Sequence, residues 1–226
     1  MADEICTDNT AGCRKSRFLL LLIALLGLVV IEPFLFDFTR INFLLDIFFS
    51  AILFSSIFAV SEKKQTAVIA VLLAVPKFAT TWAFTFISHP LLYLFDSIFG
   101  IIFMAYIIIL ILAHIFKQKE VSLETIYGAI VVYILIGLMW AFLYHMTEII
   151  HPHSFTFATE LATNQRKSLF YFSFVTLTTL GYGDIAPVSG PAKSLAMLEA
   201  ITGQMYLAVL IARLVGTHIS QGILKK

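Results

Sequence analysis

Charged side chains are scarce in this sequence of 226 residues. Only 13% are Asp, Glu, Lys or Arg, whereas 60% are hydrophobic. A soluble domain of this length would expose many more charges, so the composition excludes that class of protein. Uninterrupted apolar runs of spanning length instead predict an integral membrane protein surrounded by a lipid bilayer. The formal net charge of +1 gives no reason to expect a nucleic-acid partner.

Cysteine is almost absent. The two thiols, Cys6 and Cys13, precede the first apolar run, and their spacing fits no common zinc motif. We expect free thiols in a reducing cytoplasm. The sequence also lacks a nucleophile–base motif, a Walker loop and a dinucleotide-binding glycine pattern. We therefore expect a protein that is not an enzyme and that has no organic cofactor.

Six apolar segments are long enough to cross the bilayer, and all are predicted to be helices. Ser122 is a suitable N-cap for the fifth, with Glu124 in its first turn, and Pro191 suits the first turn of the sixth. A further helix, capped by Ser168 and running to about Thr178, is too short to span. The expected spans are residues 18–36, 41–60, 66–87, 91–116, 123–145 and 191–219.

Lys and Arg are unevenly distributed over the connecting segments. With the N-terminus inside, nine lie on the cytoplasmic side and four on the outer side, which fits the positive-inside rule. This predicts a multi-pass protein of the cell (inner) membrane with both termini in the cytoplasm. The cytoplasmic group is Arg14, Lys15, Arg17, Lys63, Lys64, Lys117, Lys119, Lys225 and Lys226, and the outer group is Arg40, Arg166, Lys167 and Lys193.

A polar, glycine-containing stretch lies between the short helix and the last span. Glycines on both sides of a tyrosine allow a backbone that alternates between right-handed and left-handed conformations. Successive carbonyl oxygens can then point the same way, and a ring of such strands offers a dehydrated cation an oxygen cage. The alternative is an ordinary glycine-rich loop between helices. The stretch is Thr178-Thr179-Leu180-Gly181-Tyr182-Gly183-Asp184.

This heptad closely resembles the selectivity filter of potassium channels, with Leu180 replacing the Val of Thr-Val-Gly-Tyr-Gly. The resemblance is strong over residues 165–220, moderate for the fifth span, and only topological for residues 18–116. It implies a homotetramer around one axis, with potassium ions as the bound group. It also implies that potassium binds the Thr179 hydroxyl and a series of carbonyls, in a filter completed by Gly183 and supported by Thr178. The carbonyls are those of Thr179, Leu180, Gly181 and Tyr182.

The surroundings of Asp184 depart from the family pattern. In the family, the filter aspartate often bonds to a tryptophan or shares a proton with a glutamate of the pore helix. The matching positions here are Phe172 and Val175, and neither side chain can do this. Tyr171, Tyr182 of a neighbouring chain, or water could substitute. We hypothesise that the filter is less firmly braced and that it inactivates or loses selectivity at low external potassium.

Two residues of the sixth span are candidates for a role beside the filter. Gly203 lies at the family's spacing for a gating hinge, and the alternative is a close packing contact between helices. Glu199 is an intramembrane carboxyl group, which is costly unless paired. We predict that it braces the back of the filter through Ser173 or Thr176. The alternatives are a direct ion site and a protonated carboxyl satisfied between helices.

The inner half of the sixth span is predicted to line the cavity and its mouth. Three apolar residues at helical spacing could form a hydrophobic gate that closes by dewetting. Arg213 is expected to extend toward the lipid headgroups. The lining residues are Gln204, Leu207, Ile211, Val215 and Ile219, of which the last three form the gate.

The fourth span contains no Arg or Lys, and its only charge is Asp96. A voltage sensor needs a row of cationic residues, so we predict weak voltage dependence. Charges also occur at Glu32, Asp46 and Lys77. We interpret Lys77 as the cation of one structural salt bridge, and a proton- or ion-sensitive cluster is the alternative.

Three histidines lie on the expected outer side, at the end of the fifth span and in the polar stretch after it: His145, His151 and His153. We interpret them as solvated loop residues. The alternatives are sensitivity of the pore to external pH, because histidine titrates near neutrality, and a weak metal site.

The sequence thus predicts an all-α membrane protein with six transmembrane helices and a re-entrant pore helix and filter. Residues 1–17 form a cytoplasmic segment, 18–116 a four-helix sensor-like domain, 117–122 a linker, 123–219 the pore domain and 220–226 a short tail. No cytoplasmic ligand-binding domain is expected after the last span. The predicted function is passive, potassium-selective conduction. The alternatives are a cation channel of relaxed selectivity and a potassium uptake subunit or membrane scaffold that retains a pore motif.

Overall fold

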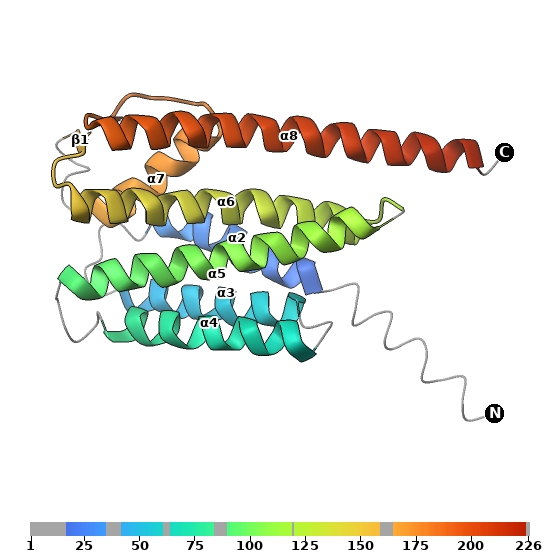
Figure 1. The fold of residues 1–226 in the computed structure, drawn as a ribbon, viewed down its shortest axis with the longest axis horizontal. Coiled ribbons are helices and arrows are strands. Elements are labelled where there is room, and N and C mark those ends of the chain that lie inside the picture. Colours follow the sequence, from blue (N-terminus) through green and yellow to red (C-terminus); the bar gives the residue numbers. More distant parts are fainter. Residues whose placement is uncertain are drawn as a thin grey trace.

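The computed structural model describes residues 17–34, 42–60, 64–83, 90–118, 120–158 and 165–224, without the side chains of residues 17, 31–34, 42–49, 60, 90, 218 and 220–224. Within these ranges the chain is mostly helical, as predicted (Figure 1). The elements are α2 (Arg17–Phe34), α3 (Asn42–Val60), α4 (Lys64–Ala83), α5 (Pro90–Lys117), α6 (Leu123–Ile150), β1 (Phe155–Phe157), α7 (Gln165–Leu177), β2 (Ile185–Pro187) and α8 (Gly190–Leu224).

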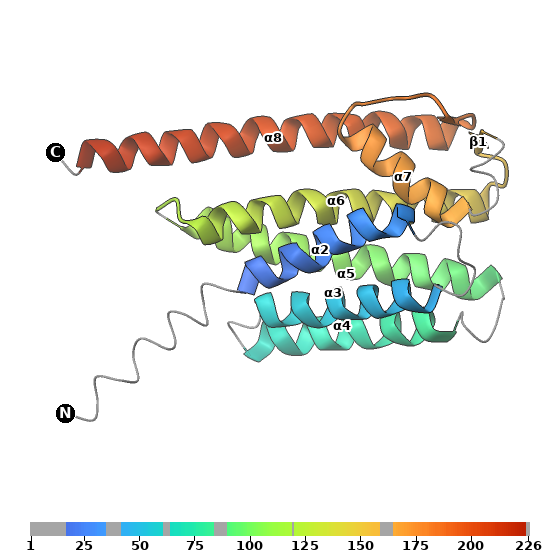
Figure 2. The same cartoon turned by 180° about the vertical axis from the view of Figure 1, so that it is seen from behind.

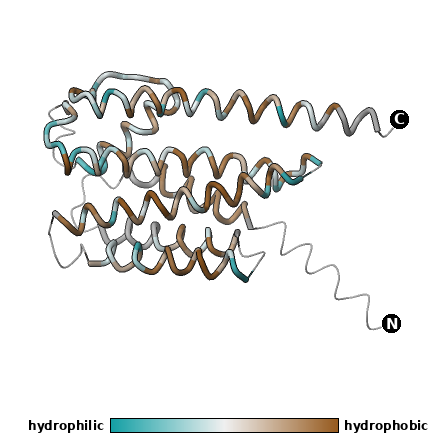
Figure 3. Tube along the Cα trace, in the orientation of Figure 1, coloured by the Kyte–Doolittle hydropathy of each residue, from teal (hydrophilic) through white to brown (hydrophobic). Residues whose placement is uncertain are grey.

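Four helices of the described part are long and apolar enough to cross a membrane. They are Lys64–Ala83, Leu91–Lys117, Leu123–Ile150 and Gly190–Thr217, and two shorter apolar helices cover Phe18–Val30 and Ser50–Ala59. Hydrophobic residues dominate the middle of the long helices, and hydrophilic residues gather near β1 and at the turn between α5 and α6 (Figure 3). The chain is therefore a membrane protein.

The long helices lie side by side, with α6 between α8 on one side and α3, α4 and α5 on the other (Figure 1). The start of α2, the α5–α6 turn and the end of α8 share one end of the molecule, and β1 lies at the opposite end. α7 crosses at an angle between α6 and α8, and the chain then returns toward β1, as Figure 2 shows from behind. β1 and β2 pair antiparallel, with Thr156 opposite Ala186.

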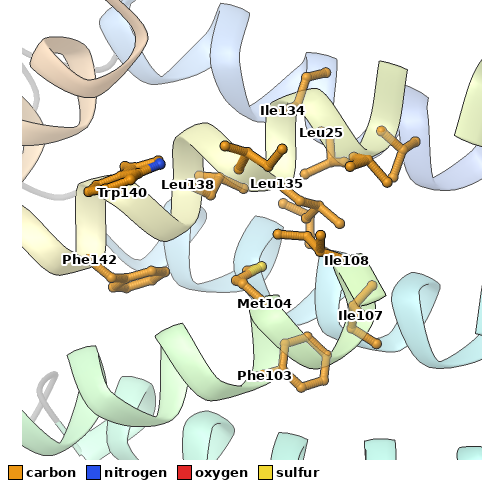
Figure 4. Close-up of a cluster of buried hydrophobic side chains, with 14 of the residues drawn as sticks. Leu25, Phe103, Met104, Ile107, Ile108, Ile134, Leu135, Leu138, Trp140 and Phe142 are labelled. Carbon is orange, nitrogen blue, oxygen red and sulfur yellow. The ribbon is translucent and has the colours of Figure 1, made fainter. Parts of the chain in front are cut away.

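The core lies mainly along the seam between α5 and α6 (Figure 4). Met104 of α5 and Leu135 of α6 are fully buried there, and Leu25 of α2 reaches the same cluster, whereas Phe103 is buried on the side of α5 that faces away from α6. Burial of these apolar side chains holds the first helices to α6. Packing against α5 fixes α6, and α7 and α8 in turn contact α6.

Helix ends follow local chemistry, and three differ from the prediction. Ser122 caps α6 in a capping box with Thr125, as expected at this N-terminus. α6 continues past His145 to Ile150, because residues 146–150 contain no helix breaker and Pro152 follows only after its end. α7 begins at Gln165, so Ser168 lies inside the helix and does not cap it. α8 extends to residue 224, beyond the predicted end at 219.

Candidate functional site

The backbone of the loop 178–184, which follows α7 directly, alternates in handedness. The φ angles of Thr179, Gly181 and Gly183 are positive, at 60°, 61° and 79°, and those of Leu180 and Tyr182 between them are not. Glycine adopts this conformation without a steric penalty. Thr179 is β-branched, and the left-handed conformation raises its steric energy by about 1–2 kcal/mol. The loop therefore has the alternating backbone that the sequence predicts.

The start of this loop is tied to the last turn of α7. The Leu180 amide donates to the carbonyl of Val175 at 2.9 Å, and the Thr178 hydroxyl donates to that of Phe174 at 2.7 Å. From α8, the Gln204 side-chain amide lies 3.4 Å from the Thr179 hydroxyl. Leu180 and Tyr182, in contrast, are 59% and 67% exposed in the single chain. One side of the loop is thus held by its own chain and the other is uncovered.

Asp184 closes the loop and connects it to two elements. Its carboxylate accepts a hydrogen bond from the Tyr171 hydroxyl of α7 at 2.7 Å. It also accepts one from the Ile185 amide at 3.0 Å, and its carbonyl accepts one from the Ala158 amide after β1 at 3.0 Å. Of the substitutes considered from the sequence, Tyr171 is therefore the one found within the chain. Asp184 is not left without a side-chain partner.

Phe172 and Val175, at the positions of the family's usual partners, are both buried. The ring of Phe172 packs edge to face against Tyr144 and Phe155, with centroids 5.0 and 5.5 Å away. Tyr144 and Phe155 are themselves 5.4 Å apart. This aromatic triad joins α6, β1 and α7 by packing in place of a hydrogen bond.

Glu199 lies fully buried behind α7 and joins three helices. The Tyr144 hydroxyl of α6 donates to one carboxyl oxygen. The Ser173 hydroxyl of α7 lies 2.5 Å from the other, and the same hydroxyl is 2.7 Å from the carbonyl of Gly137. Gly137 lets the two helices approach, because a Cβ there would lie 2.9 Å from the ring of Phe174. The partner is thus Ser173, one of the two predicted from the sequence.

Gly203 of α8 is in close contact with the end of α7. A Cβ at this position would collide with the carbonyl oxygen of Leu177. That carbonyl also lies 3.4 Å from the Tyr133 hydroxyl of α6. Because α8 is continuous through Gly203, the structure shows the packing contact, and the hinge stays a prediction.

Beyond Gly203, α8 presents an apolar face that the described residues do not cover. Leu207 is half-buried, and the three predicted gate residues Ile211, Val215 and Ile219 are exposed. Arg213, which is predicted to reach the lipid headgroups, contacts another helix of the chain. Its guanidinium donates to the carbonyls of Ile115 at 2.8 Å and Gln118 at 3.4 Å, at the end of α5. It also lies 4.2 Å from the ring centroid of Phe116, and a cation is favourable at a helix C-terminus.

Comparison with known proteins shows which family the chain is related to. Residues 134–218 match the Ion_trans_2 family, described as an ion channel. Protein LctB of Geobacillus stearothermophilus is 30% identical over 107 residues, which cover 46% of this chain and 79% of that protein. This chain belongs to the ion channel family.

Two plant proteins share a shorter part of this ion channel. Two-pore potassium channel 4 of Arabidopsis thaliana is 41% identical over 58 residues, 26% of this chain. Two pore potassium channel a of Oryza sativa subsp. japonica is 29% identical over 100 residues, 44% of this chain. The aligned parts span only 20% and 26% of the two plant channels. No solved structure matches the chain significantly.

Two charges of the first helices, Lys77 and Asp96, meet within the described part of the chain. Lys77 of α4 pairs with Asp96 of α5, and both side chains are buried. This is a salt bridge of the kind predicted from the sequence. Arg166 of α7, which the sequence placed in the outer loop, also contacts Asp96. The side chains of Glu32 and Asp46 lie outside the described residues.

The three histidines differ in position, and the loop prediction is wrong for His145. His145 belongs to α6, where its ring meets Tyr93 edge to face at 6.0 Å and its ring nitrogens have no hydrogen-bond partner among the described residues. His151 and His153 are exposed after the helix end. Within the described part of the chain, no three His, Cys, Asp or Glu residues cluster closely enough to hold a metal ion.

Sequence reasoning missed several residues that shape the site. Glu148 of α6 accepts hydrogen bonds from the amides of His153 and Ser154 at 2.8 and 3.0 Å, which fixes the turn before β1. The Tyr206 hydroxyl of α8 donates to the carbonyl of Ala129 at 2.7 Å. A carboxylate just before the His-Pro-His turn was a usable signal for Glu148. Tyr144 and Tyr206 gave none, because their partners are 55 and 77 residues away in sequence.

Proposed function

We propose that this chain is the subunit of a potassium-selective channel in which four copies surround one pore. The observation that carries the proposal is the alternating φ pattern of Thr179, Gly181 and Gly183 directly after the short helix α7. Membership of the ion channel family and relatives named as potassium channels support the choice of ion. In this proposal the carbonyls of residues 179–182 and the Thr179 hydroxyl replace the water around potassium.

The short helix suits a position below such a filter. α7 has 13 residues, or about 20 Å of helix, which is too short for a hydrocarbon core of about 30 Å. It starts near β1 and ends toward the middle of the molecule (Figure 2). The carbonyl end of a helix carries a partial negative charge, so the end of α7 would stabilise a cation beneath the filter.

The uncovered surface supports assembly into a homotetramer. One chain supplies one strand of the filter, and a closed ring needs several identical strands. Leu180, Tyr182 and several apolar residues of α8 are exposed in the single chain, and large exposed apolar surface in a protein marks contact with lipid or a partner. In the proposed tetramer, part of this face contacts neighbouring copies and part lines the inner cavity.

The proposed topology has six crossings of the cell membrane and both termini in the cytoplasm. The start of α2 and the end of α8 lie at the same end of the molecule (Figure 1), as an even number of crossings requires. The excess of Lys and Arg in the predicted cytoplasmic segments supports the orientation.

Rubidium uptake into liposomes that contain the purified protein tests passive conduction. We expect uptake that barium blocks, because barium competes with potassium for an oxygen-lined site. Gly181→Ala is the matched variant. The added Cβ meets nothing within 4 Å, but the alanine must adopt a φ of 61°, a conformation that is strained for residues other than glycine. The variant should remain assembled and lose the barium-sensitive uptake. Wild-type uptake equal to that of empty liposomes would reject the channel and favour a scaffold or an uptake subunit.

The reversal potential with potassium on one side and sodium on the other tests selectivity. Potassium selectivity places this potential far from zero. Leu180 in place of the family's Val is the feature that favours relaxed selectivity, and a potential near zero would establish that alternative. Leu180→Val should leave a selective pore selective and would make a relaxed pore more selective.

A further inference from the structure

Asp96 is the centre of a buried charge cluster on the first helices. Its side chain is 2% exposed and lies in α5. One carboxylate oxygen pairs with the Lys77 ammonium group of α4 and accepts a hydrogen bond from the Thr81 hydroxyl at 3.0 Å. The Thr80 hydroxyl lies 3.1 Å from the same oxygen. A buried carboxylate with this many donors is compensated and fixed in orientation.

The second oxygen of Asp96 faces the pore domain. It lies 3.2 Å from the Arg166 guanidinium, whose side chain is 31% exposed. Arg166 is the second residue of α7. A cation at a helix N-terminus is unfavourable for the helix itself, because that end already carries partial positive charge. The charge of Arg166 is therefore explained by its contact with Asp96 and not by the stability of α7.

The same cluster contacts α6. The Lys77 ammonium group lies 4.6 Å from the ring centroid of Phe142. α5 approaches that ring closely, since a Cβ at Gly100 would be 3.1 Å from it. Asp96 and its partners thus connect α4, α5, α6 and the first turn of α7. The other end of α7 is fixed separately, by Gly203 and Tyr133 at Leu177.

We propose that Arg166 is a positioning residue for the filter, and that α4 and α5 act through Asp96 as a fixed support for the first turn of α7. α7 leads directly into the loop 178–184, so a tilt at its first turn changes the position of the residues that bind the ion. Asp96 is held from α4 and α7 at once, so α5 cannot slide without breaking a buried ion pair. The proposal rests on the proposed channel function and assigns a static role to the sensor-like helices.

Arg166→Gln tests the support, because Asp96 keeps Lys77 and Thr81 and the variant should still fold and assemble. We expect currents to decay roughly three- to tenfold faster in low external potassium, with the potassium–sodium reversal potential shifted toward zero, since a partly exposed ion pair has a modest energy. Arg166→Lys keeps the charge and should stay within about twofold of wild type. Lys193→Gln, which removes an exposed outer cation on α8, controls for surface charge and should not change either quantity.

A double-mutant cycle shows whether Arg166 acts through Asp96. Lys77→Met with Asp96→Asn removes the buried pair as a unit, and Arg166→Gln in that background should add no further acceleration. Hydrogen exchange of residues 166–184 in the purified protein is a second readout that does not need conduction, and Arg166→Gln should speed exchange there and not in α8.

Three results would overturn the proposal: unchanged exchange and decay in Arg166→Gln, an undiminished effect in the double-mutant background, or an equal effect of Lys193→Gln. If the wild type did not conduct, the proposed function would fail, and exchange in the same variants would still decide whether Asp96 supports α7.

Discussion

Glu199 depends on hydrogen bonds within the protein, because its side chain has no exposed surface. The Ser173 hydroxyl has one proton, yet it lies close both to a Glu199 oxygen and to the carbonyl of Gly137. It can donate to only one of them. If the Glu199 carboxyl group is protonated, its O–H can donate a hydrogen bond to the Ser173 hydroxyl, and that hydroxyl can donate to the carbonyl of Gly137. The Tyr144 hydroxyl donates to the other carboxyl oxygen, so each of these groups has a partner. The hydrogen-bond count therefore favours an un-ionised brace over an ion site.

Glu199→Gln should be tolerated, because the amide nitrogen can donate to Ser173 and the amide oxygen can accept from Tyr144 at nearly the same positions. Glu199→Leu should destabilise the assembly by about 1–3 kcal/mol, because the buried Tyr144 hydroxyl loses its acceptor. Thermal unfolding of the detergent-solubilised protein measures both. Equal losses in the two variants would show that the site needs an ionised carboxylate.

Tyr171→Phe removes the hydroxyl that donates to Asp184 while leaving the ring in place. We expect faster decay of current in low external potassium, by roughly tenfold for a charge-assisted bond of about 1.5 kcal/mol. Whole-cell or bilayer recordings at several external potassium concentrations check this. Asp184→Asn should behave similarly if the bond is what matters, whereas stable currents in both variants would contradict a role for this contact.

At the scale of helices, α7 and α8 are joined where Gly203 meets Leu177. Gly203→Ala should destabilise the protein by about 1–3 kcal/mol, because the added Cβ collides with a backbone oxygen that cannot rotate away. Gly216→Ala in the same helix is the matched control, since its Cβ would meet nothing within 4 Å. The control should be neutral or gain up to about 1 kcal/mol from helix propensity. Comparison of melting temperatures separates the two, and a neutral Gly203→Ala would favour the hinge.

The inner half of α8 is the proposed gate. Val215→Ser should raise resting conductance, because a hydroxyl in an apolar constriction favours wetting. Val209→Ser is the control, since Val209 is equally exposed in the single chain but points to another side of the helix. Resting rubidium uptake and single-channel open probability measure the difference. Equal conductance in wild type and Val215→Ser would move the gate to the filter.

For the molecule as a whole, the sequence predicts the features that depend on residues close together in the chain. The loop 178–184, the Ser122 cap and the start of α8 could be predicted because each depends on neighbouring residues. Arg166 and Asp96 are 70 residues apart, and no periodicity indicates their contact. The end of α6 was misplaced because polar residues after His145 suggested a loop, although Glu148 serves the turn from within the helix. The contact of Arg213 with the end of α5 is not predictable in the same way, because its partner Ile115 is 98 residues away in sequence.

The arrangement of the first helices around the pore leads to a prediction about voltage. Moving one charge through 100 mV yields about 2.3 kcal/mol, so steep gating needs several mobile charges. In α5 the only acidic or basic residue before Lys117 is Asp96, ignoring histidine, and it is held by Lys77 and Arg166 from two sides. We therefore expect a conductance–voltage curve with an apparent gating charge near or below about one, recorded in planar bilayers. A steep curve that carries several charges would show that α5 moves and that the buried pairs break during gating. Neutralising Asp96 together with Lys77 should not change the slope of the conductance–voltage curve, because we expect that neither group moves through the membrane field.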